Sequence, residues 1–534
     1  MNQNSKIHAP NVHLFAFHLW DALGFDSNSP VNSQQPALTS SSNSPVNPEH
    51  LWQKCNEILK NNLKVDAELN SSNLYSAKTA PPGWRVNLIV ENSVNDLAFL
   101  PFEKNIEHHG QPIFLQGFAQ PQRIDDSYAL GFNISIPEKI DGIKTSNVDV
   151  SIFQDLNPDN CLLPNSVNSY FGQTLLLTAW LSAEQNQEMR QDENFLKSLA
   201  QQCLEKFISD PNLPTFYRQG ELFGSPILEY GNPNQQASYC HILIWFLNSP
   251  ATDEIWNAAR YSDFMELFLY RNKIIRAFWE SRAYYRQIRE EYEKIELDID
   301  NTFKYLQRDR SQQRQSKGAG LKQKELEYLK RQMIEMPPRA VKYARMLSDL
   351  QFLENTIAIN AQNYQDKLNQ ISLDIKAAKK YNDSDADLSF LAAFSKETCP
   401  QFQRQIQADL GYFKHGSGLL DQATEAIRAI VAIEEAYRNA KLEVTIQAVG
   451  FGLGVAGVVA GSSPYLIKQD PPNQIVALPL PFLKVGINSF AFVLLISIGA
   501  GALVWGVVML SANSKNLLGK FKNLLNRNKQ LPPQ

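Results

Sequence analysis

Two short segments combine histidine with residues that can act as nucleophiles or metal ligands. They are His108-His109-Gly110 and Cys240-His241. Neighbouring residues of a strand point to opposite faces, so Cys240 and His241 are not expected to work together as nucleophile and base. The sequence has no GxxxxGK[ST] phosphate loop, no HExxH zinc motif and no GxSxG nucleophile elbow. We therefore expect no enzymatic activity, no catalytic residue, no metal site and no cofactor.

Binding residues are expected where charged and aromatic residues cluster. The segment RIDDSY places Arg123 close to Asp125 and Asp126, and the segment ELFGSPILEYG contains Glu229. These four residues can recognise a polar ligand or a protein partner. Alternatively, Asp125 and Asp126 form a turn that satisfies its own backbone, because aspartate is frequent in turns.

The overall composition excludes several classes of protein. Of 534 residues, 43% are hydrophobic and 20% are charged, with a formal net charge of −4, which excludes a wholly disordered chain. A mean hydropathy of −0.32 means that any membrane part is a minority of the chain. Five dispersed cysteines without a CxxC motif indicate a reducing compartment rather than a disulfide framework.

Residues 1–260 are predicted to form an α+β cytoplasmic domain with a mostly antiparallel sheet. Strands are expected at Val12–Trp20, Arg85–Val90, Leu97–Phe102, Pro112–Phe118, Tyr128–Ile136 and Tyr239–Leu247. Helices are expected at His50–Leu63, Phe171–Ser182 and Glu193–Ile208. The stretch 26–48 is rich in Ser, Asn and Pro and predicts a disordered loop.

Residues 261–443 carry heptad spacing that predicts a stalk of long antiparallel coiled-coil helices. The helices are expected at about 262–310, 322–380 and 418–443. Apolar residues such as Tyr343, Leu350, Ile357 and Tyr364 form one seam. Pro337-Pro338 predicts a break or kink, and the KHGSG segment predicts that the third helix starts near Gly418.

The loop between the first two stalk helices is the most basic part of the chain. Residues 304–345 contain twelve Lys or Arg against four Asp or Glu. If the helices pack antiparallel in order, this loop lies near the membrane and binds anionic lipids. The alternative is a solvated hairpin, and nucleic acid is not expected because stacking aromatic residues are not interleaved. The predicted membrane-surface patch consists of Arg308, Arg310, Arg314, Lys317, Lys322, Lys324, Lys330 and Arg331.

A transmembrane hairpin is predicted at 444–511. Residues 444–461 and 489–511 are uncharged runs of eighteen and twenty-three residues, and about twenty apolar residues span a bilayer core. Small residues four apart allow close helix packing, either within one hairpin or between chains of a homo-oligomer. In the first run these residues are Gly450, Gly454, Gly457 and Gly461.

The tail 512–534 is basic and predicts the orientation of the hairpin. It carries four lysines and Arg527, without an acidic residue. The positive-inside rule therefore predicts an integral membrane protein, of an inner membrane, with two spans and with both termini in the cytoplasm.

The order of these parts resembles the CorA-type two-span channel family. The resemblance covers about residues 262–534 and lies in the long antiparallel helices, the stalk continuous with the first span and the basic tail. It implies an oligomeric membrane module. The family's Gly-Met-Asn signature is absent after the first span, where the chain reads Gly461-Ser462-Ser463-Pro464-Tyr465, so no ion-site residue is transferred.

Three functions remain as hypotheses. The first is a sensor or effector, in which the cytoplasmic domain binds a ligand or partner and the stalk couples it to an oligomeric membrane module that conducts ions or perturbs the bilayer. The second is a non-conducting coiled-coil scaffold anchored in the membrane. The third is a divalent-cation transporter, for which the missing signature provides no support.

Overall fold

The structure is a computed structural model, and its contacts divide the chain into two units. The first unit contains residues 1–294 and 341–417, and the second contains 295–340 and 418–534. The residues that it describes are 6–20, 47, 49–76, 79–91, 97–192, 194–235, 240–249, 251–252, 255–256, 261–313, 321–377, 387–466, 475–477, 486–488, 499 and 502.

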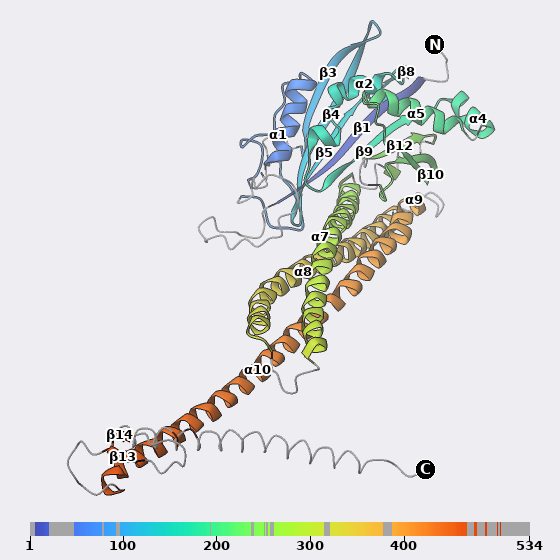
Figure 1. The fold of residues 1–534 in the computed structure, drawn as a ribbon. Coiled ribbons are helices and arrows are strands. Elements are labelled where there is room, and N and C mark those ends of the chain that lie inside the picture. The colour runs from blue at the N-terminus through green and yellow to red at the C-terminus, as the bar shows by residue number, and fades with distance from the viewer. Residues whose placement is uncertain are drawn as a thin grey trace, which may run out of the picture. The chain divides into compact units, whose positions relative to one another are not determined.

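A mixed, mostly antiparallel ten-stranded sheet forms the centre of the first unit (Figure 1). The strand order is β10-β11-β12-β9-β1-β5-β4-β2, with β3 paired to β4 and β8 paired to β1. Only the β9–β12 pair in this sheet is parallel among the described strands. The predicted α+β class is confirmed. The strands are β1 (Lys6–Leu19), β2 (Arg85–Asn87), β3 (Leu100–His108), β4 (Gln111–Ile124), β5 (Ser127–Ser135), β8 (Val148–Asp149), β9 (Gly172–Trp180), β10 (Phe216–Leu222), β11 (Ser225–Tyr230) and β12 (His241–Leu247). A separate short hairpin pairs β6 (Lys139–Ile140) with β7 (Ile143–Lys144).

Both faces of the sheet are covered. On β1, alternate residues such as Val12 and Leu14 belong to a core that includes residues of α1 (His50–Glu57) and α5 (Phe195–Phe207). The residues between them face the other way, and the ring of Phe15 lies 5.1 Å from that of Phe268 in α7 (Tyr261–Gln313). Strands covered on both faces are buried along their length, and all nine residues of β5 are buried.

The predicted helix at Phe171–Ser182 is wrong, because this segment is strand β9 in the interior of the sheet. Gly172 begins it with a φ of +89°, and Thr174 and Thr178 face α7 while Leu175 and Leu177 enter the opposite core. A run that is buried on both faces lacks the alternation that marks a strand, so its periodicity does not distinguish it from a buried helix.

The remaining elements of the N-terminal region agree with the sequence to different degrees. The predicted helix 50–63 is α1 followed by the π-helical turn η2 (Ile58–Asn62), and the helix predicted at 193–208 is α5. Strands β10 and β11 were not predicted. The other short helices are α2 (Ile152–Leu156), η3 (Pro158–Asn160), α3 (Pro164–Val167) and α4 (Ala183–Gln191).

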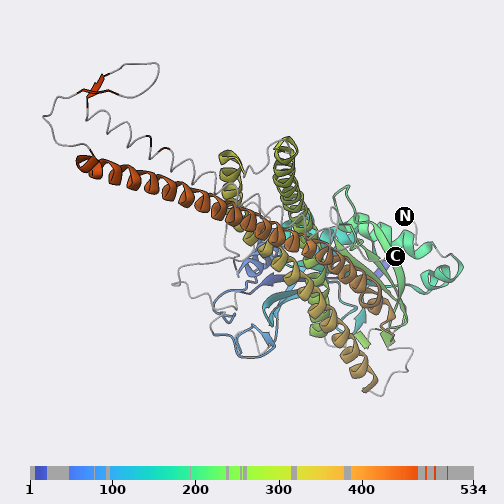
Figure 2. The same ribbon diagram turned by 60° about the horizontal axis from the view of Figure 1, so that its bottom comes forward.

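Three long helices follow, and their contacts show how they pack (Figures 1 and 2). They are α7, α8 (Gln323–Ala377) and α10 (Cys399–Leu466), with α9 (Ser389–Ala393) and η4 (Phe394–Thr398) immediately before α10. In the first unit, Phe278 of α7 stacks on Phe402 of α10 at 3.6 Å, while Tyr343 of α8 donates to the Phe413 carbonyl at 2.8 Å.

Helix α8 also packs against α10 within the second unit. Lys330 of α8 pairs with Glu435 of α10 at 2.6 Å, and Thr424 lies 3.8 Å from the sulfur of Met336. Residue numbers therefore rise along α8 as they fall along α10, so α8 is antiparallel to α10. The predicted antiparallel packing of long helices is confirmed, and the seam residues Tyr343, Leu350, Ile357 and Tyr364 are buried.

Two predicted breaks in these helices are absent, although a kink, the alternative at Pro337-Pro338, remains a prediction. Helix α8 continues through Pro337-Pro338, where Met336 is buried and Arg339 pairs with Asp298 of α7. Tertiary packing thus offsets the stability that is lost with the backbone hydrogen bonds that proline cannot form. Helix α10 begins at Cys399 rather than near Gly418, and Gly416 lies inside it. A Cβ on Gly416 would stand 2.4 Å from the Tyr292 ring, so this glycine permits close packing rather than ending the helix.

Most of the predicted transmembrane hairpin lies outside the described residues. The backbone of 444–461 lies within α10, and of 489–511 only Gly499 and Ala502 are described. In the described part of the chain, no helix is sufficiently long and apolar to cross a bilayer. A short pairing joins β13 (Ile475–Ala477) to β14 (Gly486–Asn488) between the two predicted spans. The predicted loop 26–48, apart from Asn47, and the basic tail lie outside the described residues.

Candidate functional site: a buried carboxylate between the sheet and helix α7

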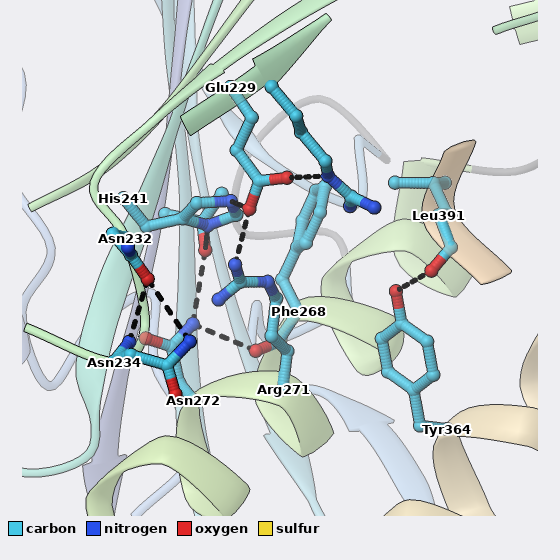
Figure 3. Close-up of polar contacts among 11 residues, drawn as sticks. Glu229, Asn232, Asn234, His241, Phe268, Arg271, Asn272, Tyr364 and Leu391 are labelled. Carbon is cyan, nitrogen blue, oxygen red and sulfur yellow. Dashed lines mark hydrogen bonds and ion pairs between the residues drawn. The ribbon is translucent and has the colours of Figure 1, made fainter. Parts of the chain in front are cut away.

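Glu229 is the centre of a buried polar cluster in the first unit (Figure 3). It lies on β11, and its side chain faces α7 because Leu228 and Tyr230 on either side enter the opposite core. Arg218 of β10 stands directly across from it in the strand register. His241 comes from the neighbouring strand β12, and Arg271 comes from α7. Residues from three strands and one helix therefore meet at a single carboxylate.

The turn after β11 determines how closely these strands approach. Gly231 has a φ of +89°, and a Cβ at this position would stand 2.2 Å from the carbonyl oxygen of Cys240. Only glycine fits this approach. The contact holds the start of β12, and thus His241, beside the end of β11.

Both oxygens of the Glu229 carboxylate are engaged. Its Oε1 lies 2.5 Å from Nη2 of Arg271 and 3.2 Å from Nε2 of His241, and its Oε2 lies 2.6 Å from Nε of Arg218. Only 1% of the Glu229 side chain is exposed. Burial alone would raise the pKa of Glu229, but Arg271, the hydrogen bond from His241 and the charge of Arg218 hold it well below its usual value. Glu229 is therefore an anion at neutral pH.

A chain of hydrogen bonds continues from His241 back to α7. Its Nδ1 lies 2.8 Å from the hydroxyl of Thr174, and the Asn272 amide donates to that hydroxyl at 3.0 Å and to the Phe268 carbonyl at 2.8 Å. Burial and the charge of Arg271 lower the pKa of His241 to about 4, despite the opposing effect of Glu229. The neutral imidazole therefore donates from Nε2 to Glu229 and accepts at Nδ1 from Thr174.

Aromatic rings cover the two arginines. The guanidinium of Arg271 lies 4.6 Å from the ring centre of Phe394, and that of Arg218 lies 4.4 Å from the ring centre of Phe390. Both rings come from the α9–η4 segment, which Tyr364 of α8 holds by donating to the Leu391 carbonyl at 3.0 Å (Figure 3). Cation–π contacts of this kind favour a fixed position of the arginines.

A cavity of about 260 Å³ lies beside the cluster and gives access to part of it. Its lining includes His241, Cys240, Asn272 and Arg276. Burial raises the pKa of the Cys240 thiol to about 12, so the thiol is protonated at neutral pH. An imidazole with a pKa of about 4 and such a thiol are unsuited to acid–base or nucleophilic chemistry at pH 7. The cavity can bind a polar ligand near the start of β12 and the first turns of α7.

The structure separates the other predicted binding residues from Glu229. Arg123 is buried on β4, donates to the carbonyls of Pro81 and Gly83 at 3.0 Å each, and covers the Trp20 ring at 4.5 Å. Asp125 and Asp126 form the tight turn between β4 and β5, and Asp125 has a φ of +51°. Asp125 and Asp126 therefore form a turn, as the alternative to a binding site predicted. Asp126 also pairs with Lys273 of α7.

A second charged cluster was missed by sequence reasoning. Arg85 of β2 lies 2.8 Å from Asp263 and 2.7 Å from Glu266, and Lys367 of α8 lies 2.6 Å from Glu266. Both carboxylates are almost wholly buried, so β2 and α8 are both tied to α7. The only signal in the sequence was a pair of acidic residues three apart in a helix that is otherwise apolar at this point.

The remaining predicted sites are described only in part. Lys322, Lys324, Lys330 and Arg331 are exposed, Lys330 is paired with Glu435, and Arg331 covers Tyr328 at 5.6 Å. Arg308 and Arg310 lie in α7, but their side chains, and all of Arg314 and Lys317, are outside the described residues. Gly450, Gly454, Gly457 and Gly461 lie within α10, and a Cβ on Gly450 would meet open space.

Four histidines outside this cluster have structural partners. His108 lies 2.6 Å from Asp155, and His109 lies 3.0 Å from the Ser151 hydroxyl. His18 stacks on His50 at 5.0 Å. No group of three or more His, Cys, Asp or Glu residues within the described ranges is arranged to hold a metal ion.

Comparisons with known proteins add no family assignment. No protein-family model, no curated protein and no solved structure matches the chain.

Proposed function

We propose that the protein is a membrane-anchored sensor or effector in which α7 couples a ligand- or partner-binding domain to an oligomeric two-span membrane module. The observation that carries this proposal is the continuity of α7. Its first turns supply Arg271 and Asn272 to the Glu229 cluster, and the same helix then contacts α10 through Phe278 and extends to Gln313. A change at the cluster therefore acts on a helix that also belongs to the long-helix bundle.

The fixed charges around α7 support a mechanical role for it. Arg271, Lys273, Asp263 and Glu266 each pair with a residue of the sheet, of its connecting turns or of α8. Ligand binding in the cavity beside His241 and Asn272 would disturb this set of contacts. A ligand can shift the equilibrium between two positions of the helix only by the difference between its binding free energies for those two positions.

The membrane part of the proposal rests on the sequence. The two uncharged runs and the basic tail favour two spans with both termini in the cytoplasm. The glycines at 450, 454, 457 and 461 favour close packing of the first span, and the basic residues of 308–331 favour contact with anionic lipid. The layout that resembles the CorA-type family supports an oligomeric module.

A coiled-coil scaffold is the second candidate, and one observation favours it. Within the first unit, large apolar side chains are exposed along a single face of α8, at spacings of eleven, seven and fourteen residues. They are Val341, Phe352, Ile359 and Leu373. Spacings near multiples of 3.6 keep residues on one side of a helix, and such a stripe favours assembly through the helices.

Topology and conductance together test the proposal. Reporters fused after Gln534 and inserted at Asp470 should give cytoplasmic and external signals respectively. The purified chain in vesicles should form a closed ring with an axial pore and cause a leak. A cytoplasmic Asp470 would contradict the membrane module, and an external topology of that residue without any leak or pore would favour the scaffold.

A further inference from the structure

A second cavity in the first unit lies on the face of the sheet toward α7, away from the Glu229 cluster. Its volume is about 350 Å³, and it shares no lining residue with the cavity beside His241. Side chains of β1, β4, β5, β9 and β12 form one wall, and Trp256 and Tyr261 close it from the other side. Ligand-binding cavities of proteins begin at about this size, roughly 300 Å³.

Aromatic rings dominate one side of this cavity. The ring centres of Trp245 and Trp256 are 5.4 Å apart, those of Trp256 and Tyr261 are 6.4 Å apart, and Phe118 lies 5.4 Å from Tyr261. His13 completes the group, 5.8 Å from Trp256. Flat apolar rings in this arrangement favour a flat guest, because stacking requires parallel or edge contacts between planar groups.

Three polar atoms of the lining residues have no hydrogen-bond partner within the described part of the chain. They are Nε2 of His13, Nε1 of Trp245 and the hydroxyl of Tyr261. The Asn133 amide donates to Nδ1 of His13 at 3.2 Å, so the proton of the neutral imidazole is on Nε2. All three atoms are therefore hydrogen-bond donors. Buried donors are nearly always paired in native proteins, so three of them around one cavity indicate acceptors on a bound molecule.

The charges around the cavity exclude an anion as the preferred guest. Among the residues that the structure describes, no lysine or arginine lines it, and the one charged lining residue is the exposed Glu138. Burial lowers the pKa of His13 to about 3, so this imidazole supplies no positive charge at neutral pH. An anion transferred into such a site would lose its hydration without a counter-charge.

We propose that this cavity binds an uncharged planar ring compound whose carbonyl oxygens accept hydrogen bonds from His13, Trp245 and Tyr261. The ring stacks against Trp256 and its neighbours, and the amides of Asn11, Gln116 and Asn133 provide further polar contacts at the wall formed by the sheet. This assignment does not depend on the membrane hairpin or on coupling through α7. It concerns only the N-terminal domain and its cavity.

The test uses the full-length chain and three uncharged planar probes, titrated separately by calorimetry. The probes are coumarin, quinazoline-2,4-dione and lumichrome, and naphthalene is the control because it has the flat ring system of coumarin without an oxygen. At least one probe should bind saturably, with one molecule per chain and an affinity at least about tenfold above that of naphthalene. No saturable binding of any probe, or equal binding of naphthalene, would overturn the proposal.

Conservative variants locate the bound probe. Tyr261→Phe removes one donor and keeps the ring, and Trp245→Phe removes one donor and leaves a smaller aromatic ring. Each variant should weaken binding about fivefold or more. Tyr261→Phe should leave the melting temperature unchanged or raise it, because it removes a buried hydroxyl without a described partner. Trp84→Phe and Tyr412→Phe make the same changes at exposed positions and should not affect binding. Unchanged affinity in both cavity variants, or equal losses in the exposed controls, would contradict the assignment.

Discussion

Nη2 of Arg271 lies 2.5 Å from Oε1 of Glu229, and both side chains are almost completely buried. The two residues are separated by more than forty positions and by strand β12, yet their pairing joins an interior carboxylate of the sheet to the first turns of a 53-residue helix. Sheet and helix are thus linked by charge as well as by apolar packing. A buried ion pair favours one arrangement of its elements, because any other leaves charges without partners.

The first prediction concerns the stability that depends on this pair. Glu229→Leu should destabilise the N-terminal domain by about 3–5 kcal/mol, because the Arg271 charge stays buried without its carboxylate. Urea unfolding followed by near-ultraviolet circular dichroism measures the change. The double variant Glu229→Leu/Arg271→Leu should recover much of the loss, since the only partner left without the carboxylate is then Arg218, whose side chain is 22% exposed.

The matched control for this prediction is Glu435→Gln in α10. Its partner is Lys330, and about half of each side chain is exposed. Exposed pairs contribute little, so we expect a change of less than about 1 kcal/mol. If Glu229→Leu were as mild as this control, the buried pair would not hold the sheet to α7.

The second prediction is a loss of stability in acid that depends on His241. Its pKa falls from 6.5 in the unfolded chain to about 4 in the folded protein. Above pH 6.5 the imidazole is neutral in both states, whereas between pH 6.5 and 4 the unfolded chain binds a proton that the folded protein does not. Stability is therefore lost as pH falls through this window, on the order of 3 kcal/mol for one group.

His241→Gln should reduce the pH slope of the free energy of unfolding between pH 6.5 and 4. Some slope should remain, because burial also lowers the pKa of His13 to about 3 and of His18 to about 4. His415→Gln, at an exposed position of α10, should leave the slope unchanged. Equal slopes in the wild type and in His241→Gln would show that His241 is not held neutral by its surroundings.

Local pattern predicted the parts of this fold in which one face of an element is apolar. The heptad seam of Tyr343 and Ile357 predicted buried packing, and the run Leu97–Phe102 predicted part of strand β3, in which buried and exposed residues alternate. Strand β9 was predicted as a helix because both of its faces are buried, which removes the alternating pattern. Gly416 was read as a helix breaker because the close approach of Tyr292 is a tertiary contact that no local window contains.

The candidate site was predictable only to the level of one residue. Glu229 stood out as an acidic residue inside an apolar, aromatic segment. Its partners Arg218, His241 and Arg271 come from two other strands and a helix, and their meeting depends on strand order. Sheets join residues distant in sequence, so composition and spacing give no signal for such a cluster.

The third prediction concerns assembly through the exposed face of α8. Phe352→Glu together with Ile359→Glu places charges on side chains that are 65% and 61% exposed. If this face joins two chains, the purified particle should become smaller by mass photometry, while the folded content by circular dichroism stays the same. Asn369→Glu adds a charge to an exposed polar position of the same helix and should leave particle size unchanged. A particle of wild-type size in the double variant would mean that this face binds no second copy.

The last prediction concerns the basic segment between α7 and α8. Arg438 of α10 donates to the Leu321 carbonyl at 2.7 Å, and Lys330 pairs with Glu435, so the start of α8 lies beside residues 435–438. These residues directly precede the first predicted span at Val444. If that span enters a bilayer, the basic segment stands near the bilayer surface, where each basic residue contributes roughly 1 kcal/mol of attraction to anionic lipid.

The chain shortened to residues 1–443 should therefore bind vesicles that contain phosphatidylserine and should not bind purely phosphatidylcholine vesicles. Binding should weaken with added salt, because the Debye length is only about 8 Å at physiological ionic strength. Replacing Arg310, Arg314, Lys317, Lys322 and Lys324 with Gln should abolish most of it. The control replaces five exposed lysines of the N-terminal domain: Lys60, Lys139, Lys144, Lys197 and Lys206. The control removes the same charge, so retained binding by the control would assign the lipid contact to the basic segment. Equal losses in both variants would mean that net charge alone causes the attraction, which would contradict a membrane-surface patch.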